Sequence, residues 1–196
     1  MKKITACFLL LALPLLAGCE QRLFHFVVTI DQTPTFPIDQ TGAFSRSIRI
    51  TEQDVLRALD VPEGGKITGV DIESLSLKVV VKPGNTAPAL SVSGRISDSQ
   101  GQSTMFQNYP IVLSGVDASF VGLNDLIETG ISKLRNKING YVMKIDNSAF
   151  DIEVSGDTVP SGQRVVLDLQ LRIKATIKYD ECLEVPLGEG GEDCNL

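Results

Sequence analysis

The sequence is poor in the side chains that most often perform catalysis or stack on sugars. Its 196 residues include no tryptophan, three tyrosines and a single histidine, His25. A Ser-His-Asp or Cys-His site would therefore have to use His25 as its base. The neighbours of His25 predict instead an ordinary histidine at the surface or edge of a sheet. The shortage of aromatic rings weighs against sugar binding and against glycoside hydrolysis, although the latter requires only two suitably spaced carboxylates.

Catalytic motifs with a fixed spacing are absent as well. The chain contains no Gly-x-Ser-x-Gly elbow, no HExxH zinc motif, no P-loop and no GxGxxG turn. We therefore expect no catalytic residue, no cofactor and no metal site, and we predict that the protein is not an enzyme. A hydrolase that uses His25 is the least favoured hypothesis.

No hydrophobic run is long enough to cross a membrane. The apolar segment 4–16 is broken by Pro14, whereas a spanning helix needs about 20 apolar residues. Lys2 and Lys3 precede the segment, and small residues follow it before the chain becomes polar. A basic start, an apolar centre and a small-residue cleavage site are typical of a secretory signal peptide, which we assign to residues 1–18.

The end of this segment resembles the export signal of bacterial lipoproteins. Residues 15–19 read LLAGC, which follows the family's pattern of Leu, an apolar or small residue, Ala or Ser, Gly or Ala, and Cys. The resemblance implies that Cys19 begins the mature chain and carries a thioether-linked diacylglycerol, usually with a third acyl chain on its amino group. Since each buried methylene contributes roughly 0.8 kcal/mol, such an anchor is nearly permanent. The residue after Cys19 is Glu20 and not Asp, which in this family implies delivery to the cell outer membrane. The resemblance does not indicate whether the domain faces the periplasm or the exterior.

The cysteines that remain predict one disulfide. Of four cysteines, Cys7 leaves with the signal and Cys19 takes the lipid, so Cys182 and Cys194 are left. An even pair in an exported protein is typical of a disulfide. The alternative is a metal site built on the same two thiols, which lacks a nearby histidine.

Charge excludes some partners of the mature chain. Loss of residues 1–18 removes two lysines, so 16 basic residues face 24 acidic ones and the net charge is −8. A surface of this sign argues against nucleic acid, which requires clustered Lys and Arg. The tail, residues 181–196, is acidic and contains no Lys or Arg. We predict a solvated tail that a disulfide closes, with calcium binding as the alternative.

Domain organisation follows from length and spacing. The 178 residues after the signal suffice for one ordinary domain, which we place at residues 23–180. Residues 19–22 form a short tether that reaches about 14 Å from the lipidated Cys19, at about 3.5 Å per residue. The folded body is therefore expected close to the membrane surface.

Period-two alternation predicts most of the secondary structure. The clearest strand that this alternation predicts is 164–178. Residues 104–113 are predicted to form an edge strand, because Pro110 has no backbone N–H to donate to a neighbouring strand. Residues 31–42 read as a loop rich in Pro, Thr and Asp. Strands are expected over 23–30, 44–50, 74–82, 90–96, 104–113 and 164–178.

Two helices complete the prediction. Thr51 and Asp54 form a capping box before a short helix that ends ahead of Pro62. The second helix is expected over 124–139, where Leu123, Ile127, Ile131, Leu134 and Ile138 recur at helical spacing, with Asn124 or Asp125 as the cap. Together these elements predict a mainly β (α+β) fold, either an antiparallel β-sandwich or a curved sheet with two short-to-medium helices.

Two function classes remain. The favoured hypothesis is a lipid-anchored cell-envelope lipoprotein that acts, without catalysis, as a structural module or as a module that binds a protein partner of the envelope. The alternative is a periplasmic carrier or binder of lipid or another apolar ligand, because strands with one apolar face can enclose a cavity as well as a solid core.

Overall fold

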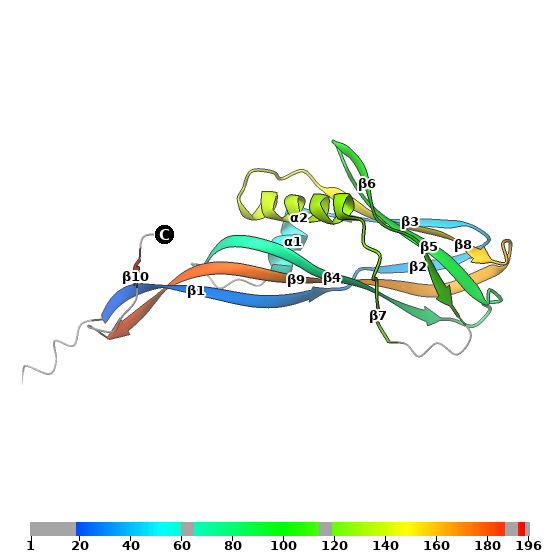
Figure 1. Cartoon of the computed structure of the whole chain (residues 1–196), viewed down its shortest axis with the longest axis horizontal. Helices are drawn as coiled ribbons and strands as arrows, with labels where there is room; N and C mark the ends of the chain where they lie inside the picture. Colours follow the sequence, from blue (N-terminus) through cyan, green and yellow to red (C-terminus); the bar gives the residue numbers. More distant parts are fainter. Residues whose placement is uncertain (1–18, 60–64, 114–118, 187–191, 195–196) are drawn as a thin grey trace, which may run out of the picture.

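Over the residues that the structure describes, the protein is mainly β, with two antiparallel sheets and two helices, as the sequence predicts (Figure 1). The computed structural model describes residues 19–59, 65–113, 119–186 and 192–194. The predicted signal peptide, residues 1–18, lies outside the described residues. The two sheets pack face to face over part of their length, which makes the fold sandwich-like, and the helices lie at one side of this sandwich.

The larger sheet is organised around one very long strand, β9. This strand spans Arg164–Pro186, and its 23 residues would extend over about 75 Å at about 3.3 Å per residue. Its neighbours on one side are β2 and then β1, end to end, and on the other side β4. The strands of this sheet are β1 (Cys19–Gln32), β2 (Thr35–Thr41), β4 (Lys66–Val81), β7 (Val121–Gly122), β9 (Arg164–Pro186) and β10 (Glu192–Asp193).

The two faces of β9 differ as the alternation predicts. Its apolar residues are buried from Val165 through Tyr179, whereas the residues between them meet solvent. On the wet face, charged side chains pair across neighbouring strands. These pairs are Arg164 with Asp39 (3.0 Å), Lys82 with Asp168 (2.5 Å), Lys174 with Glu73 (2.9 Å), Lys178 with Asp71 (3.4 Å) and Arg172 with Asp31. Each exposed pair adds little stability, but together they make one face of the sheet soluble.

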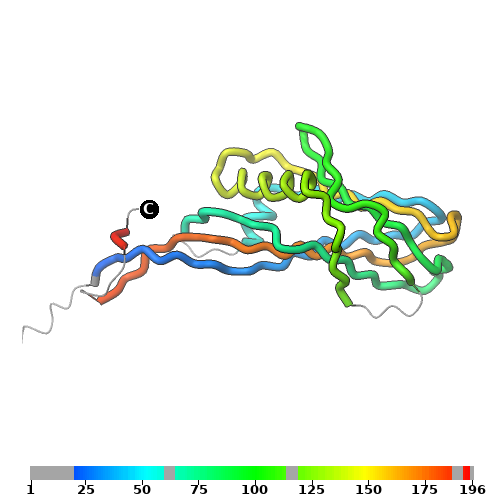
Figure 2. Tube along the Cα trace, in the orientation of Figure 1, coloured from blue at the N-terminus to red at the C-terminus, as the bar shows by residue number. Residues whose placement is uncertain are grey.

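The anchor end of the sheet is a two-stranded ribbon. The pairing of β4 with β9 ends at Asp180, and beyond it residues 19–24 of β1 pair with 181–186 of β9 (Figure 2). The expected tether at residues 19–22 is therefore wrong, because these residues are strand. The expected tail also begins too early, since 181–186 belong to β9. The backbones of residues 19–24 and 181–186 hydrogen-bond to each other. This pairing is between distant parts of the sequence, so hydropathy does not predict it.

The ribbon also changes the expected distance between anchor and body. Pairing of β1 with β9 is continuous from Cys19 to Gln32. Phe26, the first β1 residue that packs against the hydrophobic core, lies seven residues from Cys19, which corresponds to about 23 Å along the strand. A stiff ribbon, rather than a tether of about 14 Å, separates the body from Cys19.

The smaller sheet has the order β3-β8-β5-β6. Pro110 lies in β6, which is an edge strand as predicted. The segment 31–42 is not simply a loop, since it contains β2, whose Phe36 and Ile38 are buried. β8 has no counterpart among the predicted strands. The strands of this sheet are β3 (Phe44–Ile50), β5 (Ala89–Asp98), β6 (Gly101–Val112) and β8 (Phe150–Val159).

Helix α1, Glu52–Leu59, begins at the predicted capping box. The Thr51 backbone N–H donates to Asp54 Oδ2 at 3.0 Å, and the Asp54 N–H donates to Thr51 Oγ1 at 3.3 Å. These bonds satisfy two backbone donors at the helix start. The Thr51 hydroxyl also donates to Asp54 Oδ2 at 2.6 Å, and this bond, together with the one from the Thr51 backbone N–H, lowers the pKa of the Asp54 carboxyl. Val55 and Leu59 are buried, so the helix presents one apolar side to the body.

Helix α2, Glu128–Val142, is displaced from the predicted range 124–139. The predicted apolar stripe is confirmed at Ile131, Leu134 and Ile138, which are buried. The caps are wrong, because the residue before the helix is Ile127 and makes no side-chain cap. Asn139 does not end the helix. Its side chain bonds the backbone N–H and C=O of Val70 at 2.9 and 3.1 Å, and thus joins α2 to the outer edge of β4.

A buried ammonium group joins α2 to the smaller sheet. The Lys137 side chain is 5% exposed, and its Nζ lies 2.5 Å from Asp146 Oδ2 and 3.9 Å from Asp98 Oδ2. Nζ also donates to Ser148 Oγ at 2.7 Å and lies 5.7 Å from the centroid of the Tyr141 ring. The Lys137 hydrogen bond lowers the pKa of Asp146 to about 2. These contacts fix the end of α2 against β5 and the segment before β8.

Gly130 marks the closest approach of α2 to β6. A Cβ atom at this position would lie 2.2 Å from the backbone oxygen of Thr104. Helix propensity alone predicts that Gly130→Ala stabilises the protein by about 1 kcal/mol. We expect the opposite, a loss of about 1–3 kcal/mol, because the added methyl group overpacks a backbone contact. Urea unfolding should show this loss, while the exposed helix variant Asn136→Ala stays near the wild type. A Gly130→Ala variant as stable as the wild type would contradict the packing of α2 on β6.

Candidate functional site

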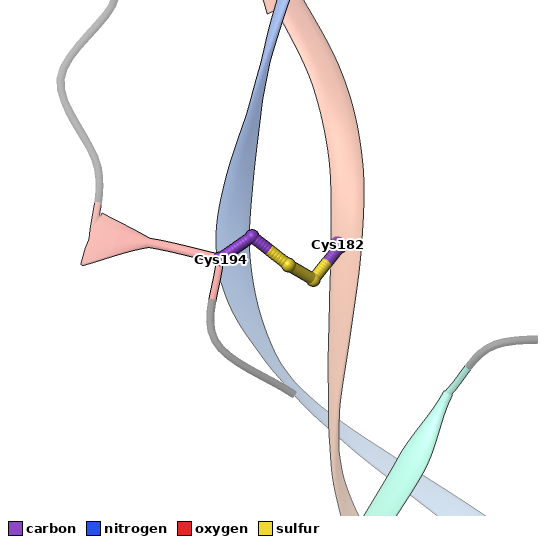
Figure 3. Close-up of a disulfide and its surroundings, with 2 residues drawn as sticks. All are labelled: Cys182 and Cys194. Atoms are coloured by element: carbon purple, nitrogen blue, oxygen red, sulfur yellow. A yellow bond between two sulfur atoms is a disulfide. The ribbon is translucent and has the colours of Figure 1, made fainter.

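The ribbon carries three of the predicted site residues, Cys19 at its tip and the pair Cys182 and Cys194 four residues farther along. Cys19 is the first residue of β1 and lies opposite Pro186 of β9. Cys182 and Cys194 form a disulfide with a Cα–Cα distance of 5.8 Å, which lies within the usual range (Figure 3). The predicted pairing of these two cysteines is therefore confirmed, and the alternative of a metal site on the same thiols is set aside.

The disulfide holds a third short strand against the ribbon. Cys194 follows β10, which pairs with Arg22 and Leu23 of β1. Arg22 Nη1 lies 2.7 Å from Asp193 Oδ1. The acidic tail is thus folded back along β1 at residues 192 and 193, while residues 187–191, which carry all of its glycines, lie outside the described residues. Within the described ranges, no group of three or more Asp, Glu, His or Cys side chains is placed to hold a metal ion.

His25 lies beside this disulfide with carboxylates near both ring nitrogens. Its side chain is 62% exposed, Nδ1 lies 2.6 Å from Asp180 Oδ1, and Nε2 lies 3.8 Å from Glu192 Oε2. The hydrogen bond to Asp180 is the main reason that the pKa of His25 is raised. A catalytic base needs one nitrogen directed at a nucleophile, and here both face carboxylates. The arrangement is that of an exposed histidine at the ribbon.

A second candidate site is an apolar pocket between the helices and the two sheets. Its volume is about 400 Å³, and fourteen of its eighteen lining residues are apolar. They come from α1, α2 and strands of both sheets. The floor includes Val70 on β4, Leu134 on α2, and Phe150 and Ile152 on β8, all 2% exposed or less. This volume lies within the range of roughly 300–1,000 Å³ that small-molecule sites occupy.

The pocket has a polar mouth. The four polar residues in its lining, Gln32, Thr33, Arg49 and Asp54, are all exposed, whereas the floor is buried. A sealed empty void of this size would cost on the order of 10 kcal/mol at about 24 cal/mol per Å³. That cost would equal the whole stability of an ordinary domain. The pocket is therefore a site that solvent or a ligand enters, rather than a packing defect.

The third candidate site is the outer edge of β1. On this side β10 pairs only with Arg22 and Leu23, and the structure, over the residues it describes, places no strand beside Phe24–Gln32. This stretch, FHFVVTIDQ, has no proline, glycine or lysine and keeps an unbroken register with β9. Val27 is 67% exposed and Val28 is 37% exposed. A regular, apolar edge of this kind is a template for another strand.

Other edges carry features that prevent such pairing. β2 contains Pro37, and β6 contains Pro110 together with register shifts opposite Val92 and Gly94. The outer edge of β4 is covered by β7 at Ser76 and Leu77 and by the Asn139 side chain at Val70. The β1 edge differs from these three, because none of these features protects it. The remaining edge strand, β3, is shorter and carries Arg46 and Arg49.

Comparison with known proteins does not assign a family. No family model matches the chain, and no curated protein matches it in sequence. Among solved structures, the BFDV capsid protein in decameric form matches with 14% identity and a TM-score of 0.38, covering 79% of this chain and 99% of that one. The 60-mer form of the same capsid protein matches with 9% identity and a TM-score of 0.35, covering 85% and 98%. Likeness at this level carries no argument about function.

The structure confirms some site expectations and leaves others as predictions. It pairs Cys182 with Cys194 and places His25 on an exposed strand, as expected. The sequence leaves open whether the apolar residues of the pocket form a solid core or line a cavity, because the pattern is the same for a filled and an open interior. No helix among the described residues is long and apolar enough to cross a membrane.

We expect the pKa of His25 to lie above its ordinary value of about 6.5 and to fall in Asp180→Asn, since that variant removes the main cause of the shift. A raised pKa adds stability that is present below pH about 6.5 and is lost as the pH rises through the folded-state pKa. His25 is the chain's only histidine, so one imidazole signal in an NMR titration reports it. Glu192→Gln is the matched control and should produce a smaller decrease. Equal pKa values in Asp180→Asn and the wild type would contradict the contact.

Proposed function

We propose that the protein is a lipid-anchored lipoprotein of the cell outer membrane that binds a protein partner of the envelope without catalysis. The observation that carries this proposal is the unprotected β1 edge, Phe24–Gln32, which begins five residues from Cys19. The lipoprotein-like segment at 15–19 supports the anchor. The paired ribbon supports a fixed spacing between the anchor and the body, because two hydrogen-bonded strands are stiffer than a free tether.

The partner is expected to add an extended segment to β1. Backbone hydrogen bonds would supply affinity, and the exposed side chains of Val27 and Thr29 would supply specificity. A second copy of this chain fits less well. Symmetric antiparallel pairing of β1 with β1 would direct the two Cys19 residues toward opposite ends of the joined sheet, whereas both anchors would insert into one membrane. The favoured partner is therefore a different envelope protein with an extended segment.

The first test concerns the anchor. We expect the mature protein, extracted from membranes, to start at Cys19 and to carry two or three acyl chains, as measured by mass spectrometry of its N-terminal peptide. Cys19→Ala should lose the acyl groups, since no thioether can form. Cys7→Ala is the control, because Cys7 lies within the predicted signal, and it should remain acylated. An unacylated protein, or one that starts at another residue, would contradict the anchoring proposal.

The second test concerns the β1 edge. A photoreactive residue at position 29 should crosslink one defined envelope protein in intact cells. Val27→Lys should abolish this adduct, because a lysine on an edge strand opposes pairing with a further strand. Val112→Lys is a matched control, since Val112 lies on edge strand β6 and is 65% exposed against 67% for Val27. Retention of the adduct in Val27→Lys, or equal loss in both variants, would count against the edge as the binding surface.

The apolar pocket favours a second function, the binding of an apolar ligand. The pocket adjoins the β1 edge, since Ile30 and Gln32 belong to both, but Val27 and Thr29 do not line the pocket, so the two functions can be tested separately. The mouth includes Gln32 and Asp54, whereas the most exposed apolar residue of the edge is Val27.

A further inference from the structure

We propose that the pocket between α1, α2 and the two sheets holds the hydrocarbon tail of one single-chain amphiphile, with the polar head of this ligand at the mouth. This inference rests on the second function proposed above and is independent of the protein partner.

Size selects a single chain. An apolar cavity of about 150 Å³ holds one benzene molecule. The volume of 400 Å³ therefore suits a ligand with roughly two to three times as many carbon atoms. One alkyl chain of medium length has this size, whereas a phospholipid with two full chains does not.

The lining selects an aliphatic tail. The apolar lining is aliphatic except for Phe150. Examples are Ile48 and Ile50 on β3, Ile138 on α2 and Ile173 on β9. The floor presents no charged residue, since the charged lining residues Arg49 and Asp54 are both at the exposed mouth. A ligand with polar groups along its length would lose its hydrogen bonds to water on entry. A plain hydrocarbon tail would not.

The polar residues at the mouth favour an amphiphile over a pure hydrocarbon as the ligand. Gln32, Thr33, Arg49 and Asp54 offer hydrogen-bonding groups where the pocket meets solvent. A polar head placed there stays hydrated while the tail is buried, and this division of polarity matches that of a fatty acid or a lysolipid. Both ligands share one tail and differ in the head, so the tail is the chemistry that the pocket recognises.

The protein's own anchor cannot fill the pocket. Ile30 lines the pocket, and it lies about 36 Å along the paired strand from Cys19 at about 3.3 Å per residue. One acyl chain spans about half of a hydrocarbon core that is about 30 Å thick. The occupant therefore comes from a separate molecule.

Native mass spectrometry of the mature, acylated protein tests the inference, with laurate as the probe. A steroid-based detergent is used because its rigid body is not a single alkyl chain. We expect one laurate per protein and no adduct with butyrate, which has the same carboxylate but almost no tail. Ala58→Phe, on the α1 wall of the pocket, should reduce the laurate-bound fraction by about tenfold or more, because the ring occupies the space of the tail.

A control variant and a folding check are needed to interpret the loss of laurate binding. Ala89→Phe is the control variant, since Ala89 lies on β5 and does not line the pocket, and it should keep laurate. A melting temperature of Ala58→Phe at or above that of the wild type would show that the variant is folded. If Ala58→Phe does not fold, Ala175→Leu, on the β9 wall of the pocket, is used in its place. Absence of a laurate adduct in the wild type, or equal adducts in the wild type and the pocket-filling variant, would overturn the inference. Val27→Lys should still bind laurate, so that failure of the partner surface is distinguishable from failure of the pocket.

Discussion

The hydrogen-bonded ladder along β9 is the constraint on which the rest of the structure depends. β9 pairs with β2 near its start, with β1 toward its end and with β4 on its opposite side. Its buried residues from Val165 to Tyr179 form one wall of the core, and its charged residues keep the other face in water. Because this strand is longer than any of its partners, the sheet has a broad body and a narrow end.

The candidate surfaces are consequences of this unequal pairing. Where β4 ends, β1 and β9 continue alone and carry Cys19 to the tip. Along Phe24–Gln32, the outer edge of β1 has no neighbouring strand among the described residues. Farther along, the two sheets are bridged by α1 and α2 instead of by facing strands, and the apolar pocket lies beneath these helices. Asn139 and Lys137 hold α2 in a fixed position, so the space below this helix keeps its shape.

Local signals predicted the elements that depend on neighbours in sequence. Alternation identified most of β9, the Thr51–Asp54 box marked the start of α1, and two remaining cysteines indicated the disulfide. Elements that depend on a distant partner were missed or misplaced. Residues 19–22 and 181–186 look polar and irregular until each is seen as the other's strand, and Asn139 resembles a helix end until its contact with Val70 is known.

The amino-acid sequence by itself determined the fold class, the resemblance to a lipoprotein signal and the acidic, motif-poor character of the chain, because these properties follow from composition and short-range spacing. Only the tertiary structure decided that the interior is partly open, that the β1 edge is unprotected and that a ribbon separates Cys19 from the body. Apolar residues such as Ile50, Leu134 and Ile173 have the same pattern whether they touch one another or surround a cavity. The difference lies in how far apart the packed elements are held, and contacts between distant residues set that distance.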